Sequence, residues 1–176
     1  NASRQPSFLF DSRSSFYLMK SAVNLKKENN THLFATYFLP SFKLRISGHY
    51  YLITNYTYFT SYYKVNQENS LFNLLQIAIH KTIKLGKRWN WHADIWFQQK
   101  IGNVALNVPV IYTRNRIGYE GNLGFKNLDI AIGTEIKYRA AYKADGYSPV
   151  LGQFYYQDQT TISNSLPDVS AYLHFR

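Results

Sequence analysis

The sequence predicts an all-β fold, an antiparallel transmembrane β-barrel of the up-and-down type with about eight or nine strands in this chain. Three observations lead to this prediction. Apolar and polar residues alternate over long segments, these segments are longer than ordinary strands, and aromatic residues make up 18% of the 176 residues. Successive side chains of a strand point to opposite faces, so the alternation gives one apolar and one polar face. We treat residues 1–176 as a single barrel segment.

The first two alternating segments lie in the first half of the chain. Phe42, Leu44, Ile46 and Tyr50 alternate with Lys43, Arg45, Ser47 and His49. In residues 71–85 the apolar positions are odd-numbered, namely Leu71, Leu75, Ile77, Ile79, Ile83 and Leu85. Asn73 and Lys81 interrupt this apolar face. Each segment is therefore predicted to be a strand with one apolar face.

Three further segments repeat the pattern. In residues 88–98, Trp89, Trp91, Ala93, Ile95 and Phe97 alternate with Arg88, Asn90, His92, Asp94 and Gln98, and Trp96 stands on the polar face. In residues 128–142, Leu128, Ile130, Ile132, Ile136, Tyr138, Ala140 and Tyr142 alternate with Asp129, Ala131, Gly133, Glu135, Lys137 and Arg139. At the end, Val169, Ala171, Leu173 and Phe175 alternate with Asp168, Ser170, His174 and Arg176.

Turn-forming residues separate these segments, at 39–41, 66–70, 86–87, 102–103, 124–127 and 143–153. Many of the intervening segments are roughly 10 to 16 residues long, whereas strands of soluble proteins average about 5 or 6 and membrane crossings need about 9 to 11. Strand length therefore favours a barrel wall over a soluble sandwich.

Aromatic residues gather near two expected loops. One group is Tyr50, Tyr51, Tyr56, Tyr58, Phe59, Tyr62 and Tyr63, and the other is Tyr142, Tyr147, Phe154, Tyr155 and Tyr156. Amphipathic rings at strand ends are typical of a bilayer interface. A Tyr-rich soluble β protein that uses these rings as cross-strand pairs is the alternative interpretation.

Composition and motifs exclude several classes of function. The net charge is +10, from 20 Lys and Arg against 10 Asp and Glu, but these basic residues are spread along the strands and not clustered as in a nucleic-acid-binding surface. No apolar run reaches the length of a membrane-spanning helix. The chain has no cysteine, no nucleophile elbow, P-loop or dinucleotide fingerprint, and its five histidines show no ligand spacing. We expect neither an enzyme nor a bound cofactor or metal.

The candidate functional residues are charged residues on two neighbouring segments, 110–120 and 127–143. If the apolar face contacts lipid, the side chains that line the lumen are those of Arg114, Arg116, Glu120, Asp129, Glu135, Lys137 and Arg139. Opposite charges on adjacent strands can pair across the sheet and stiffen the wall, whereas unpaired cations would favour anionic solutes. Both interpretations remain open at this point.

Three stretches, YYLITNYTYF (50–59), VPVIYTRNRIGYEG (108–121) and YRAAYKADGYSPVLGQFYYQ (138–157), resemble the C-terminal half of the family described as putative porins of Bacteroidetes. The resemblance extends from about Phe42 to Arg176. It implies a barrel in the bacterial outer membrane, in contact with lipid and lipopolysaccharide, through which small solutes diffuse, and it implies no catalytic residue. Members of that family are much longer, so we expect this chain to be a fragment of a larger barrel.

Three functions follow as hypotheses. The first is a porin for passive diffusion of small polar solutes, anions among them, through a net-positive lumen. The second is a structural or accessory outer-membrane barrel with a plugged lumen, which acts with partner proteins in a larger transport or secretion complex. The third is a soluble β-barrel that binds an apolar ligand, with its apolar face inward and its charged face outward.

Overall fold

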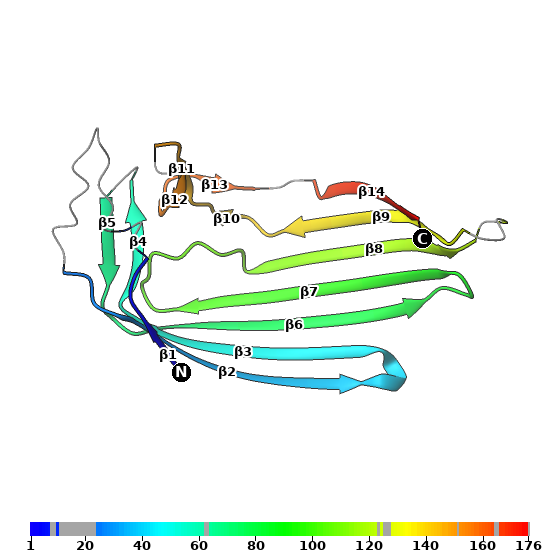
Figure 1. Cartoon of the computed structure of the whole chain (residues 1–176), viewed down its shortest axis with the longest axis horizontal. Helices are drawn as coiled ribbons and strands as arrows, with labels where there is room; N and C mark the ends of the chain where they lie inside the picture. The colour runs from blue at the N-terminus through cyan, green and yellow to red at the C-terminus, as the bar shows by residue number, and fades with distance from the viewer. Residues whose placement is uncertain are drawn as a thin grey trace.

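The computed structural model describes residues 1–7, 10, 24–61, 64–122, 124, 128–150, 152–163 and 166–175. Eight strands form one antiparallel sheet in the order β1-β2-β3-β6-β7-β8-β9-β14 (Figure 1). Their bounds are β1 (Ala2–Arg4), β2 (Glu28–Leu39), β3 (Leu44–Thr54), β6 (Phe72–Lys84), β7 (Trp89–Ile101), β8 (Ile111–Gly121), β9 (Ile130–Arg139) and β14 (Asp168–Phe175). Neighbours in the sheet follow one another along the chain, which confirms the predicted meander.

The sheet is open in the described part of the chain. β1 pairs only with the first three residues of β2, and β14 pairs only with β9, so most of the outer edge of β2 and the outer edge of β14 have no partner strand among the described residues. The predicted alternating segments all form strands, but the closed barrel is not seen. No helix among these residues has the length and hydropathy that crossing a membrane requires.

The connections differ at the two ends of the sheet (Figure 1). At one end, which we call the turn end, the 3₁₀ turn Pro40–Phe42 joins β2 to β3, and residues 85–88 join β6 to β7. Lys43 and Gly86 adopt positive φ angles of 47° and 94° there, as tight reversals require. β8 ends and β9 begins at this end as well, and residues 125–127 of the expected turn 124–127 lie outside the described residues.

Long connections lie at the opposite end, which we call the loop end. They contain three two-stranded ribbons: β4 (Tyr56–Thr60) with β5 (Lys64–Glu68), β10 (Tyr142–Lys143) with β13 (Thr161–Ile162), and β11 (Gly146–Ser148) with β12 (Gln153–Tyr155). The sequence predicted no ribbons here. Figure 1 shows them gathered at one end of the long strands, with β1 beside them.

The two faces of the sheet follow the predicted alternation. Because directly paired residues share a face, the register places Ile46, Ile79, Ile95 and Tyr138 on one face and Ser47, Ala78, Asp94 and Arg114 on the other. The first is the apolar face and the second the polar face, and this is the parity that the sequence predicts.

Exposure on these faces is the reverse of that in a soluble protein. On the apolar face Ile95 is 42% exposed and Ile132 43%, although both lie in interior strands, and only Ile130 of its described residues is buried. On the polar face Ser47 and Asp94 are each 8% exposed. A soluble domain buries its apolar side chains and leaves its charged ones in water.

Four members of the aromatic groups predicted from the sequence, Tyr56, Tyr58, Phe59 and Tyr156, take part in a small core at the loop end. Phe59 is buried, Tyr58 packs edge-on against Tyr156 at 6.0 Å, and Tyr56 packs edge-on against Phe72 at 5.7 Å. A parallel bridge between Thr60 and Tyr156 joins the two loop segments. These rings therefore hold the loop segments together and do not lie along the apolar face. Tyr62 and Tyr63, predicted as part of the first group, lie outside the described residues.

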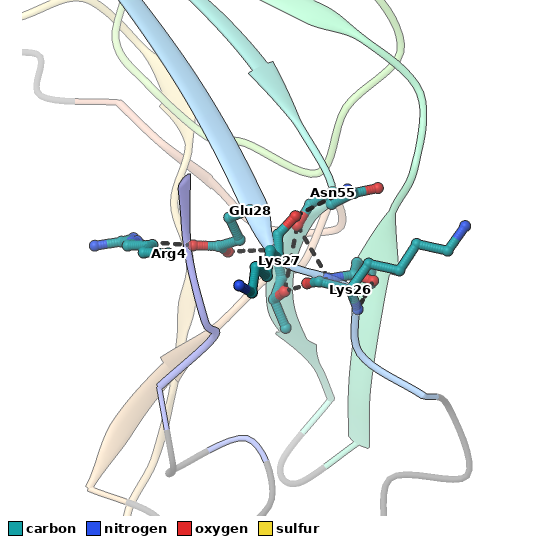
Figure 2. Close-up of polar contacts among 7 residues, drawn as sticks. Arg4, Lys26, Lys27, Glu28 and Asn55 are labelled. Carbon is teal, nitrogen blue, oxygen red and sulfur yellow. Dashed lines mark hydrogen bonds and ion pairs between the residues drawn. The ribbon is translucent and has the colours of Figure 1, made fainter. Parts of the chain in front are cut away.

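A buried polar cluster fixes the β4–β5 ribbon to the start of β2 (Figure 2). The Glu28 carboxylate accepts hydrogen bonds from Arg4 Nε and from the Thr57 backbone N–H, each at 2.9 Å. The Gln67 amide accepts from the backbone N–H of Lys26 and donates to its carbonyl. Glu28, Thr57 and Gln67 are all buried. Since a buried polar group is stable only when it is hydrogen-bonded, this cluster holds the ribbon in one position.

Candidate functional site

Charged side chains cross the polar face in rows perpendicular to the strands. The longest row contains Arg45, His80, Asp94, Arg114, Lys137 and Asp168, one from each of six adjacent strands. The row towards the turn end contains Thr82, His92, Arg116, Glu135 and Ser170. Polar residues meet in these rows because each strand places alternate residues on the same face. This polar wall is the candidate functional site.

Asp94 is the most enclosed charge of the wall. Its Oδ1 lies 2.9 Å from His80 Nδ1, and its Oδ2 accepts hydrogen bonds from Arg114 Nε at 3.0 Å and Nη2 at 2.7 Å. A guanidinium group that donates twice to one carboxylate oxygen makes a strong, directional ion pair. Both oxygens of the carboxylate are therefore occupied, and the charge of Arg114 is neutralised.

Trp96 is the large apolar residue that interrupts the polar face of β7. Its contacts with this cluster explain its position there. Its ring lies edge-on to His80 at 5.4 Å and packs on Tyr112 at 5.1 Å, and the Arg114 guanidinium lies 5.7 Å from its centroid. A cation over an aromatic face is attracted by the ring quadrupole. Trp96 thus contacts both partners of Asp94, His80 and Arg114, and contributes a cation–π contact to Arg114.

The second acidic residue of the wall, Glu135, pairs with only one of its two basic neighbours. Lys137 Nζ lies 2.7 Å from Glu135 Oε1, whereas Arg116 Nε lies 3.9 Å from Oε2, beyond hydrogen-bonding distance. Arg116 Nε is buried and has no hydrogen-bond partner in the described part of the chain. Arg116 is therefore only weakly compensated, and it lines a cavity of about 470 Å³ with His92, Ser170, Tyr172 and His174.

The remaining predicted residues differ in their environment. Arg139 Nη2 donates to Asp168 at 2.9 Å in an exposed pair, and Glu120 accepts from Asn90 Nδ2 at 3.0 Å. Asp129 precedes β9, is exposed, and makes no ion pair with any described residue. Six of the seven predicted residues thus lie on β8 and β9 on one face, and Asp129 stands apart from them.

Sequence reasoning did not select Asp94, His80 or Asp168 as site residues, although these three complete the ion pairs. Their parity placed them on the polar face, which was the available signal. The histidines were also judged to be dispersed, yet His32 Nε2 and His49 Nδ1 lie 3.0 Å apart, stacked beside Tyr51. No group of three or more His, Asp or Glu side chains that could hold a metal occurs in the described residues.

Comparison with known proteins agrees with this geometry. Searches of curated proteins and of solved structures found no significant match. A family model described as putative porin matches residues 1–176, the whole chain. An antiparallel meander of long alternating strands is the architecture of a membrane barrel wall. The chain therefore belongs to the putative porin family.

Proposed function

We propose that the eight-stranded sheet is part of the wall of a bacterial outer-membrane β-barrel that lets small polar solutes diffuse through its lumen. Membership of the porin family supports a porin-like role in general. The observation that carries the proposal is the reversed exposure of the two faces: Ile95 is open to the surroundings, while Asp94 beside it in the chain is buried. Lipid favours an apolar outer face, and a water-filled lumen favours a polar inner one.

The open sheet edges support the proposal that this chain is one segment of a larger barrel. In hydrocarbon every unpaired backbone N–H and C=O group costs several kcal/mol, so a sheet is stable there only as a closed barrel. In this proposal further strands pair with the outer edges of β2 and β14, which have no partner strand among the described residues. Refolding of the 176-residue chain alone into a protease-resistant monomer in detergent would contradict the need for further strands.

The unequal connections suggest an orientation. Outer-membrane barrels have short turns on the periplasmic side and longer loops on the extracellular side. The turn end would then face the periplasm, and the loop end with its three ribbons would face the outside.

The charges of the wall support a weak preference for anions. The predicted set contains four cations, Arg114, Arg116, Lys137 and Arg139, against three carboxylates, Glu120, Asp129 and Glu135. Fixed positive charge raises the local anion concentration in a narrow passage. Three of these cations are paired within 2.9 Å, which leaves Arg116 as the main contributor of the four.

Reversal potentials in a salt gradient test this preference. The complete barrel in a planar bilayer should favour anions, and the change of all four cations to Gln should reduce that preference. Arg116→Gln and Arg139→Gln each remove one fixed positive charge, and Arg139→Gln also leaves Asp168 unpaired, so each change alone should shift the reversal potential in the same direction. A pore that prefers cations before any change, or one whose selectivity is insensitive to all four substitutions, would contradict the assignment.

A second candidate function is an accessory barrel in a larger complex, and exposed apolar residues at the loop end favour it. Tyr147, Val150 and Phe154 of the β11–β12 hairpin are 54%, 60% and 65% exposed, outside the long sheet. An exposed apolar patch of this kind is typical of a protein contact. Absence of conductance from the complete, folded barrel would favour this role over a porin. Extraction of the protein without detergent would instead favour a soluble ligand-binding barrel.

A further inference from the structure

A cavity of about 440 Å³ opens on the polar face at the turn end, between the β2–β3 turn and the end of β6. Its lining residues are Phe38, Lys43, Arg45, His80, Lys81, Thr82 and Asp94. This lining contains three basic side chains and a single carboxylate. It is separate from the β8–β9 residues that the sequence predicted as the site.

The carboxylate of this cavity does not balance the basic residues. Asp94 already binds His80 through Oδ1 and Arg114 through Oδ2, and Arg114 supplies its counter-charge from the other side. In the part of the chain that the structure describes, neither Lys43 nor Arg45 forms an ion pair. The positive charges next to Asp94 are therefore uncompensated within the described chain.

A third cation adds to this charge. Lys84, the last residue of β6, lies on the polar face close to Lys43. Desolvation and the like charge of Lys84 lower the pKa of Lys43. Lys81 also lines the cavity, and its Nζ keeps its charge 5.6 Å from the centroid of the Phe42 ring. Lys43, Arg45 and Lys81 thus form a basic cluster in the cavity lining, without an ion-pair partner among the described residues.

We infer that Lys43, Arg45 and Lys81, the basic side chains that line this cavity, form a binding site for a phosphate group at the turn end of the polar face. A doubly charged oxyanion would compensate the cluster, and the planar Arg45 guanidinium suits two phosphate oxygens at once. The cavity has room for more than inorganic phosphate. The phosphate group can belong to a small solute in the lumen or to a lipid headgroup at the membrane surface.

The inference rests on the proposed barrel only for the source of the phosphate group, since binding itself requires no conduction. The test uses the complete barrel in uncharged detergent at low ionic strength, titrated with inorganic phosphate in a calorimeter. We expect one saturable site. Lys43→Gln combined with Arg45→Gln should weaken binding by roughly tenfold or more, because a hydrogen bond to a charged group contributes about 1.5 to 3 kcal/mol.

The matched control is Lys64→Gln combined with Lys143→Gln, which removes the same charge from the loop end, where both lysines are exposed and unpaired among the described residues. Its affinity should stay within about twofold of the parent chain. Arg45→Lys keeps the charge and should keep most of the binding. If the double variant does not fold, Lys43→Gln alone, in an exposed turn, replaces it.

A second arm identifies the source of the phosphate group. Phosphatidylglycerol added to the micelles should suppress the phosphate titration if the site takes a lipid headgroup, and should leave it unchanged if the site takes a soluble phosphate ester. Either result supports the site. No saturable phosphate binding, or equal loss in the site variant and the control, would overturn it. A chain that binds phosphate but belongs to a barrel without conductance would contradict the pore and leave this inference intact.

Discussion

Ile95 is the position at which the membrane assignment can be tested most directly. It lies at the centre of β7, with six residues on each side in this thirteen-residue strand, and its side chain is 42% exposed on the apolar face. We expect Ile95→Arg to destabilise the folded protein strongly in a lipid bilayer. In a soluble protein the same substitution at an exposed position would change stability by about 0.5 kcal/mol or less.

The expected cost of Ile95→Arg follows from the depth of Ile95 in the membrane. Six residues at about 3.3 Å each place Ile95 about 20 Å along the strand from either end, and a strand tilt of about 40° reduces this to about 15 Å along the membrane normal. That depth is the midplane, where Arg on the lipid face costs about 2 to 4 kcal/mol. Ile132 is the third residue of β9, about 5 Å deep by the same reckoning, so Ile132→Arg should cost about 0 to 1 kcal/mol.

Denaturant titration of the complete barrel in phospholipid vesicles measures both costs. Gln76→Arg is the control, because Gln76 lies within β6 on the polar face and should tolerate the charge. The reasoning would be refuted by equal losses at Ile95 and Gln76. A cost at Ile132 as large as at Ile95 would refute the depth argument alone.

Three further predictions concern the packing of the sheet. A Cβ at Gly118 would clash with the Tyr172 hydroxyl, so Gly118→Ala should cost about 1 to 3 kcal/mol in denaturant titrations. Tyr172→Phe should relieve most of that cost, and failure of this rescue would contradict the contact. Arg114→Gln should destabilise the fold by about 1.5 to 3 kcal/mol, because it leaves the buried Asp94 carboxylate without its charge partner. Arg139→Gln, in an exposed pair, should cost about 0 to 1 kcal/mol, and equal costs would argue against a buried ion pair. Gln67→Ala should speed hydrogen exchange in the β4–β5 ribbon several-fold without changing exchange in β7, and uniform changes would show that the polar cluster does not act locally.

The sequence predicts the long strands well because strand periodicity is a local property. Residues 71–85 were expected as a strand and form β6 (Phe72–Lys84), and residues 88–98 form most of β7 (Trp89–Ile101). The exceptions to alternation also have local causes. Trp96 packs on the polar cluster, and Lys81 stands near the turn end over Phe42. β2 was not recognised because its alternation is weak, with Phe34 and Phe38 on the polar face.

The partners of the charged residues could not be predicted in the same way. Parity places Asp94 and Arg114 on one face, but only the register between β7 and β8 shows that they are directly opposite. A shift of one residue would turn one strand's side chains to the other face, and a shift of two would give every cation a different neighbour. The loop ribbons could not be predicted for a related reason. Their strands are two to five residues long, too short for an alternating pattern to be visible.

Register also changes the meaning of the net positive charge. A count of residues on β8 and β9 treats each cation as equally available to a solute. In the structure Arg114, Lys137 and Arg139 each have an acidic partner within hydrogen-bonding distance, so the centre of the polar wall is close to neutral. Lys43 and Arg45, which form no ion pair with any described residue, lie at the turn end, outside the segments from which the charge was counted. The position of unpaired charge, and not the total, decides where an anion is held, because a paired cation exerts little field beyond its partner.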